Sequence, residues 1–230
     1  MTSSEPLEIG TEIAGDVRIA SVVETDALGY RYLVTVGPDN HPGELFEFMP
    51  RALAGRDGRG RLAPLRAEDA ESLRLGLARF RAEAEALRAT RHPNVAAVDR
   101  VIETRGTTCI LLPCDEGCTL AAMAENLRRL PTQDELDRLV APLIAALSSL
   151  HKRGVIHCNI GPETIRLGPD QTPMLVRFGA TRAFLASRTR TVGDCVTPGY
   201  SAPELYLSDA SAQGAACDVF SLAATLYRLV

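Results

Sequence analysis

Residues 157–165 read His-Cys-Asn-Ile-Gly-Pro-Glu-Thr-Ile, and this stretch decides the fold. An apolar segment of helical period and Gly154 come before it, and a short strand-like run comes after it. A glycine and a proline between such elements predict a tight loop. Loops held between buried elements often carry function, so we take this stretch as the candidate site.

The second half of the chain surrounds this loop with predicted helices. Thr132 with Glu135 three residues later forms a capping box, which predicts a helix that continues with buried leucines to about Gly154. Short strands are expected at 165–167 and 174–176, and polar residues 187–194 indicate a loop. A last helix is expected to begin near Asp218 and to continue to Val230.

The first half is richer in strand patterns. Runs of β-branched and aromatic residues predict strands at 17–23, 30–36, 44–48, 95–102 and 107–112. A stripe of apolar residues predicts one long helix over 67–89. Residues 50–64 contain glycines and arginines, which predict a solvated surface loop, with partner docking as the alternative.

These patterns predict an α+β fold with two lobes. The first lobe, residues 1–112, is expected to hold a five-stranded antiparallel sheet and the long helix. The second, residues 113–230, is expected to be mainly helical and to stop after its central helix. That helix is apolar on all sides, so we expect either a fragment of a longer protein or a surface for self-association.

Composition excludes several classes of partner. The net charge is −4 and the arginines are spread among acids, which argues against nucleic acid or an anionic membrane. The sequence contains neither an apolar run of the ~18 residues that span a bilayer nor a leader, so a cytoplasmic location is expected. The histidines show no metal-ligand spacing. Free thiols are expected at Cys109, Cys114, Cys118, Cys158, Cys195 and Cys217, with zinc binding or disulfides as the alternative.

Four stretches in order resemble motifs of the bacterial serine/threonine protein kinases. Residues 157–164 resemble the catalytic loop H-R-D-L-x-x-x-x-N, and Arg177-Phe178-Gly179 resembles D-F-G. Residues 198–204 read P-G-Y-S-A-P-E, which closes the family's activation loop, and residues 218–222 resemble the D-x-x-S-L start of the central helix. The resemblance covers about residues 16–230 and implies the two-lobed kinase fold.

The resemblance also implies that the family's chemical groups are replaced here. The positions of the general base, the two magnesium ligands and the phosphate-contacting lysine hold other residues, Asn159, Thr164, Arg177 and Phe46. The glycine-rich turn holds Glu24, Asp26, Ala27 and Gly29, and the adenine slot is expected to be filled by Glu44 and Arg166. We therefore expect no cofactor and no metal, and we expect a pseudokinase that is not an enzyme, although residual activity stays open.

The remaining matches are implied to be structural, namely Glu83, His157, Phe178, Gly179, Pro203, Glu204 and Asp218. Asp218 is expected to accept backbone N–H groups of the 157–159 loop. Glu83 is expected to pair with Arg177 in place of the lost lysine.

The function that this reading favours is a signalling scaffold or an allosteric module that binds another signalling protein. Two alternatives stay open. One is an unorthodox nucleotide-dependent transferase in which other carboxylates replace the lost ligands. The other is a switch that senses ATP without metal.

Overall fold

The computed structural model describes residues 3–114, 117–127, 129–179, 181, 184–185, 196–207 and 213–230. The chain divides into two compact units. The first comprises Met1–Ala89 and Ala97–Cys114, and the second comprises Thr90–Ala96 and Asp115–Val230. Sheet and helix occur in both units, which confirms the predicted α+β class.

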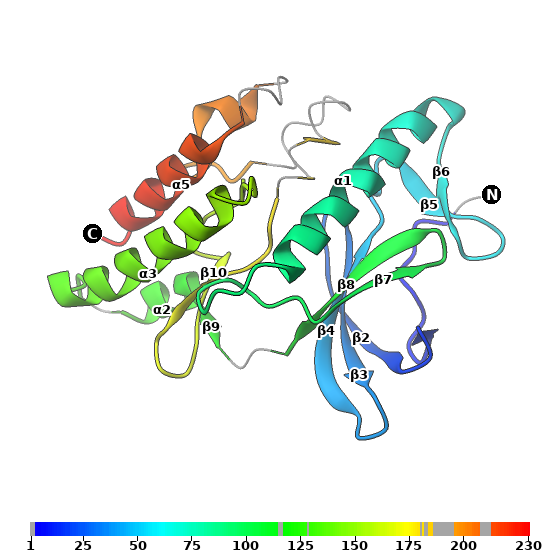
Figure 1. Cartoon of the computed structure of the whole chain (residues 1–230), viewed down its shortest axis with the longest axis horizontal. Helices are drawn as coiled ribbons and strands as arrows, with labels where there is room; N and C mark the ends of the chain where they lie inside the picture. Colours follow the sequence, from blue (N-terminus) through cyan, green and yellow to red (C-terminus); the bar gives the residue numbers. More distant parts are fainter. Residues whose placement is uncertain are drawn as a thin grey trace. The chain divides into compact units, whose positions relative to one another are not determined.

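A six-stranded antiparallel sheet forms most of the first unit, in the order β1-β2-β3-β4-β8-β7 (Figure 1). Its strands are β1 Glu12–Ile13, β2 Val17–Thr25, β3 Gly29–Val36, β4 His41–Phe48, β7 Arg100–Thr104 and β8 Thr107–Pro113. Strand β1 is the additional one, because two residues are too few to leave a period in the sequence. The strand expected at 95–102 begins only at Arg100.

The stretch 50–64 differs from the solvated loop that the sequence predicts. It contains a two-stranded hairpin, β5 Ala54–Arg56 and β6 Leu62–Pro64. The Asp57 carboxylate closes the turn by accepting the backbone N–H groups of Arg59 and Arg61 at 2.8 and 2.9 Å. The prediction failed because local glycine content signals turns but says nothing of strands that pair across them.

One face of the large sheet packs against helix α1, Ala70–Arg88, which a short 3-10 turn at Ala67–Asp69 precedes. Side chains alternate along β4, so Phe46 and Phe48 point to the same face. Their ring centroids lie 5.7 and 5.1 Å from that of Phe80 on α1. Aromatic contacts, edge-on for Phe46 and stacked for Phe48, therefore attach the helix to the sheet.

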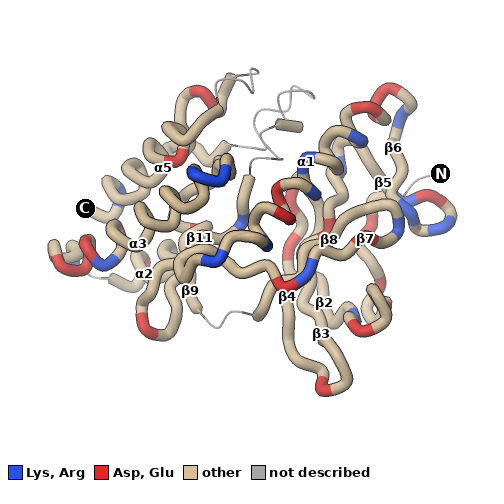
Figure 2. Tube along the Cα trace, in the orientation of Figure 1, with Lys and Arg blue, Asp and Glu red and all other residues tan. Residues whose placement is uncertain are grey.

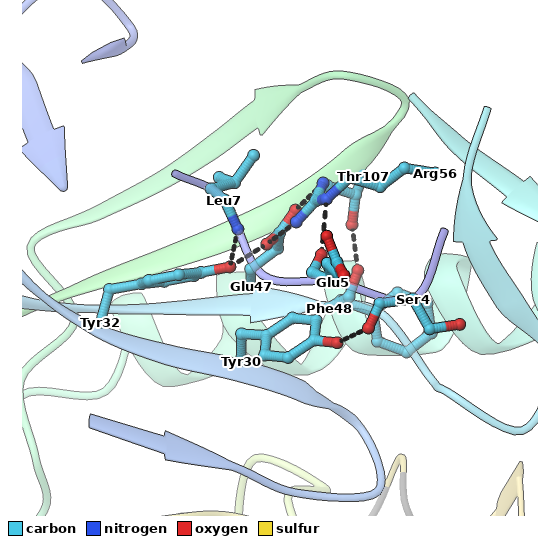
Figure 3. A network of polar contacts seen from close by, with 9 residues as sticks. All are labelled: Ser4, Glu5, Leu7, Tyr30, Tyr32, Glu47, Phe48, Arg56 and Thr107. Carbon is cyan, nitrogen blue, oxygen red and sulfur yellow. Dashed lines mark hydrogen bonds and ion pairs between the residues drawn. The ribbon is translucent and has the colours of Figure 1, made fainter. Parts of the chain in front are cut away.

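Glu47, between these two phenylalanines on β4, points to the other face of the sheet and carries a buried charge (Figure 3). The Glu47 side chain is fully buried, and its two oxygens accept hydrogen bonds from the Arg56 guanidinium at 2.9 and 2.7 Å. The Tyr32 hydroxyl donates to the same carboxylate at 2.8 Å. Burial and this negative charge together raise the pKa of Tyr32, so its phenol stays protonated at neutral pH.

Figure 3 also shows how this network holds the N-terminal segment. The Arg56 Nε donates to the carbonyl of Glu5 at 3.0 Å, and the backbone N–H of Leu7 donates to the Tyr32 hydroxyl at 3.0 Å. The Tyr30 hydroxyl donates to the carbonyl of Ser4. Buried polar groups thus fix residues 4–7, which belong to none of the described strands or helices.

The second unit contains three helices of a turn or more and a three-stranded sheet, within the residues described. The helices are α2 Leu120–Asn126, α3 Gln133–His151 and α5 Ala215–Tyr227. A 3-10 turn spans Pro203–Tyr206, and the sheet joins β9 Cys118–Thr119, β10 Ile165–Leu167 and β11 Pro173–Leu175. The predicted loop at 187–194 lies outside the described residues.

The ends of these helices follow local sequence signals. The predicted capping box is confirmed: Thr132 Oγ1 accepts the N–H of Glu135 at 3.3 Å, and the Glu135 carboxylate accepts the N–H of Thr132 at 2.8 Å. Helix α5 begins three residues before Asp218 and ends at Tyr227. Its buried side carries Asp218, and its exposed side carries Val219 and Phe220.

The buried ion pair between Glu47 and Arg56 predicts an unequal response to two similar substitutions. Arg56→Ala leaves the Glu47 charge buried without its partner and is expected to lower the free energy of unfolding by ~3–5 kcal/mol. Arg18→Ala removes an exposed ion pair with Glu12 and is expected to cost at most ~1 kcal/mol. Urea unfolding followed by circular dichroism measures both. Equal losses of unfolding free energy in the two variants would show that the buried ion pair stabilises the fold no more than the exposed one.

Candidate functional site

The candidate loop at 157–165 is held by one carboxylate. Asp218 on α5 is fully buried, and its Oδ2 and Oδ1 accept the backbone N–H groups of His157 and Cys158, both at 2.8 Å. The Nε2 of His151, the last residue of α3, lies 2.8 Å from the same Oδ2. A single side chain thus ties the loop to two helices of the second unit.

The backbone of this loop is strained at Cys158. Its φ of 56° lies in the left-handed region, which costs a residue with a side chain ~1–3 kcal/mol. The conformation persists because the Cys158 N–H is bonded to Asp218 and its side chain is packed against Ala202, Leu205 and Cys217. The loop shape is therefore imposed by its surroundings.

Asn159 and Thr164, at the positions of the family's base and metal ligand, make hydrogen bonds with the backbone. Asn159 Nδ2 donates to the carbonyl of Arg177 at 2.8 Å. Thr164 Oγ1 accepts the N–H of Gly161 at 2.9 Å and donates to the carbonyl of Asn159 at 2.5 Å. The neutral amide of Asn159 cannot act as a base at neutral pH. The hydrogen bonds of Asn159 and Thr164 instead hold the loop in position.

The segment Arg177-Phe178-Gly179 lies against the loop. The rings of His157 and Phe178 have centroids 4.2 Å apart, and the N–H of Gly179 donates to the carbonyl of His157 at 2.8 Å. A Cβ at Gly179 would lie 2.7 Å from the Cβ of Asn159, so only glycine fits there. Arg177 has a φ of 61°, a second left-handed residue in this region.

Glu204 and Cys217 meet beside the loop. The Cys217 sulfur donates to Glu204 Oε1 at 3.1 Å, and Pro203 starts the short turn that carries Glu204. Burial, with the Glu204 carboxylate beside it, raises the pKa of the Cys217 thiol to about 11. Five cysteines are free thiols in the described part of the chain, and Cys195 lies outside it.

In the first unit, Phe46 at the position of the family's lysine has a cationic neighbour. Arg31 is its partner across β3 and β4, and the guanidinium carbon of Arg31 lies 4.9 Å from the centre of the Phe46 ring. Arg31 is buried and pairs with Glu44, and its Nε lies 3.7 Å from a Glu24 oxygen. The sequence reading missed Arg31, although strand pairing opposite residue 46 could have revealed it.

The turn at the glycine-rich position is closed by its own acid. Asp26 Oδ1 accepts the N–H groups of Leu28 and Gly29 at 2.7 and 3.0 Å. A Cβ at Gly29 would lie 1.9 Å from the carbonyl oxygen of Glu47. This glycine is therefore required by the close approach of β4, and Ala27 beside it is half-buried.

The charges expected in the adenine slot have partners within their own units. Glu44 pairs with Arg31 in the first unit, and Arg166 Nη2 donates to the carbonyl of Gly117 at 2.5 Å in the second. Glu83 and Arg177 also belong to different units, so their pairing stays a prediction. Filling of the slot stays a prediction for the same reason.

The described residues offer neither a metal-binding cluster nor a membrane-spanning helix. Within them, no group of three or more histidine, cysteine or acidic residues could hold a metal ion. None of the described helices is both long and apolar enough to span a bilayer.

The geometry around Asp218 predicts the result of a conservative change. Asp218→Asn keeps the shape but replaces one acceptor oxygen with a donor facing backbone N–H groups, which is expected to cost ~3 kcal/mol or more. Asp170→Asn, at an exposed turn, serves as the control and is expected to lower the melting temperature much less. Thermal unfolding measures both. Similar melting temperatures would contradict the role given to Asp218.

Comparison with known proteins matches the sequence to one family. The family model described as "Protein kinase domain" matches residues 65–230. The chain is 31% identical over 155 residues to CBL-interacting protein kinase 16 of rice, and 26% identical over 148 residues to the serine/threonine-protein kinase KIN4 of Saccharomyces cerevisiae. These matches cover 66% and 64% of the chain but only 33% and 18% of the two relatives, so the chain spans a third of their length or less.

Solved structures give the same result for the fold. The structure titled "PpkA-294 apo form" matches 99% of this chain and 79% of its own, with a TM-score of 0.81 at 24% identity. The PknI kinase domain of Mycobacterium tuberculosis matches 97% of this chain and 75% of its own, with a TM-score of 0.66 at 25% identity. The kinase-like fold with a sheet-bearing and a mainly helical part is confirmed.

The comparisons contradict the prediction that the chain is not an enzyme. The matched family and the curated relatives are protein kinases, and catalytic inactivity does not follow from the replacement of motif residues. That prediction considered only what Phe46, Asn159, Thr164 and Arg177 replace, and it left out neighbouring groups such as Arg31. With its family model matched over residues 65–230, the chain belongs to the protein kinase domain family.

Proposed function

We propose that this protein kinase domain acts in signalling by binding another signalling protein, as a scaffold or an allosteric module. One observation carries the proposal: the polar side chains of the candidate loop bond to the chain's own backbone. Asn159 donates to Arg177, Thr164 bridges Gly161 and Asn159, and Asp218 accepts two backbone N–H groups. This role is compatible with phosphate transfer and does not require it.

A rigid framework suits recognition of a folded partner. Binding costs less free energy when the surface is already ordered, because less conformational entropy is lost on association. The strained backbone at Cys158 and the close packing at Gly179 show that the loop has one imposed shape. Such a framework presents the same surface to a partner with or without a bound nucleotide.

The test is crosslinking of the tagged chain in the organism that encodes it, followed by reconstitution with the purified partner. We expect direct binding with a Kd below ~10 μM, about −7 kcal/mol, in the absence of ATP. The Asp218→Asn variant, which loosens the loop, serves as the comparison. Failure to reconstitute any complex, or binding only during turnover of ATP, would contradict the proposal.

A second candidate function is nucleotide-dependent phosphate transfer by a rearranged site. The observation that favours it is Arg31, a buried cation beside Phe46 on the sheet face that carries the family's lysine. A guanidinium binds phosphate oxygens in a forked geometry. Here Glu44 and Glu24 hold it, so a phosphate would have to take the place of at least one carboxylate.

A thermal-shift measurement with ATP separates these functions. If Arg31 binds phosphate, ATP with magnesium at 100 times its Kd stabilises the chain by ~2.7 kcal/mol, and Arg31→Gln abolishes the shift. Arg18→Gln, at an exposed arginine of the same sheet, is expected to keep the shift. Absence of a shift in the unmodified chain would contradict transfer, and a shift that does not need metal would support an ATP-sensing switch.

A further inference from the structure

Arg228, directly after helix α5, lies against the turn at 197–201 of the second unit. The carbon of its guanidinium lies 5.2 Å from the centre of the Tyr200 ring, whose face attracts cations. Its Nη2 and guanidinium carbon lie 2.5 and 3.2 Å from the point that a Cβ at Gly199 would take. The guanidinium therefore contacts both the tyrosine ring and the bare backbone of the glycine.

Gly199 makes room for this arginine. Its φ of 84° lies in the left-handed region, and the Cβ of any other residue would meet Arg228 Nη2. The turn around it is fixed, because the N–H groups of Tyr200 and Ser201 both donate to the carbonyl of Thr197 at 3.0 Å. Ser201 Oγ in turn accepts the N–H of Thr197 at 2.8 Å. The arginine thus rests on an ordered turn.

The charge of Arg228 is exposed and has no anion beside it. Among the residues that the structure describes, none forms an ion pair with Arg228 or accepts a hydrogen bond from its guanidinium. The exposed arginines Arg74, Arg88 and Arg129, in contrast, each pair with a glutamate. A guanidinium that stacks through its face keeps its N–H donors for an acceptor in its plane. Arg228 is therefore oriented and still able to bind an anion.

Tyr200 connects this arginine with the candidate loop at 157–165. Its Cγ lies 4.0 Å from the point that a Cβ would take at Gly161, a buried residue of that loop. The N–H of Gly161 donates to Thr164 Oγ1 at 2.9 Å, which fixes the backbone at this contact. A ligand that reaches Arg228 along the tyrosine ring therefore also lies beside the candidate loop.

We propose that Arg228 binds the carboxylate of an acidic side chain in a segment of a partner protein. The carboxylate accepts two hydrogen bonds from the edge of the guanidinium, the geometry in which this pair is strong and specific. Tyr200 and Gly199 hold the guanidinium in place before the partner arrives, so less conformational entropy is lost on binding. The inference rests on the proposed binding role and names the chemistry of the partner.

The distribution of charge favours a single carboxylate over a strongly anionic ligand. Figure 2 shows acidic and basic positions interspersed along the described chain, and the net charge of the whole chain is −4. A segment with many negative charges would be repelled by this overall charge. A phosphate group carries more charge and more acceptor oxygens than one guanidinium can satisfy. The attraction therefore comes from one local contact.

The test uses the whole chain and a rhodamine-labelled peptide with blocked ends, Lys-Leu-Ala-Glu-Ser-Leu-Ala-Lys, with fluorescence anisotropy as the measurement. The overall charge of the chain favours the peptide's more basic analogue with Gln in place of Glu, whereas Arg228 favours the Glu form. The Gln analogue is expected to bind at least about tenfold more weakly, equal to ~1.4 kcal/mol. Equal or tighter binding of the Gln analogue would overturn the proposal, and so would no binding of the Glu peptide at about 1 mM chain.

Variants of the chain locate the contact. Arg228→Gln is expected to weaken binding of the Glu peptide at least about tenfold. The matched control Arg153→Gln, at an exposed position of the same unit, is expected to change Kd less than about twofold. Tyr200→Leu leaves the net charge unchanged but removes the ring, and is expected to weaken binding about threefold. Equal losses in Arg228→Gln and Arg153→Gln would overturn the proposal.

Reversal of the charge excludes a merely structural role. Arg228→Glu is expected to prefer a peptide with Lys in place of Glu, by at least about tenfold more than the control Arg153→Glu does. The same preference in both variants would overturn the proposal. Circular dichroism melts verify that every variant is folded. A peptide with Gln in place of Glu and a phosphorylated Ser tests the other anion, and tighter binding of it than of the Glu peptide would overturn the assignment to a carboxylate.

The experiment separates this inference from the proposed function. If a partner reconstituted with the chain binds the Arg228→Glu variant unchanged, the binding role stands and Arg228 is not the recognition residue. If the Glu peptide binds at Arg228 as expected but no partner can be reconstituted, the carboxylate site stands and the signalling role fails.

Discussion

The arrangement of the second unit depends on the Asp218 carboxylate. Its two oxygens accept the N–H groups of His157 and Cys158 and contact the His151 ring, so one fully buried charge joins α5, α3 and the candidate loop. A buried carboxylate is stable only when its oxygens are saturated with donors. The loop supplies two of these donors by adopting a left-handed conformation at Cys158, so the strain of the loop and the burial of the charge are coupled.

The first unit has an analogous centre, but its charge is balanced by a cation. The Glu47 carboxylate and the Arg56 guanidinium satisfy each other, and their remaining donors and acceptors bind Tyr32 and the carbonyl of Glu5. This network fixes the β5–β6 hairpin and the N-terminal segment to the sheet.

Features with local signals could be predicted from the sequence, and features that depend on pairing could not. The stripe of apolar residues predicted α1, and Thr132 with Glu135 predicted the start of α3, because each of these signals lies within one helix. Strand β1, the β5–β6 hairpin and the burial of Arg56 depend on segments that meet only in the folded chain. The prediction about enzyme activity failed in a related way, since residue identities at motif positions do not show which cations lie nearby. Arg31 becomes visible only through the register of β3 and β4.

Helix α1 illustrates how a replaced residue changes the physics of a site. In the kinases that the chain resembles, a lysine at the position aligned with Phe46 pairs with the helix glutamate. Here the Phe46 ring meets the Phe80 ring edge-on and the Phe48 ring stacks on it. Aromatic packing is insensitive to salt, but contacts of exposed arginines with anions weaken as ionic strength rises. The aromatic part of the attachment of α1 to the sheet therefore depends little on ionic strength, whereas the exposed ion pair between Arg81 on α1 and Glu103 on β7 weakens as salt is added. The two contacts can vary separately because they use different side chains of one helix, Phe80 for the aromatic contact and Arg81 for the ion pair.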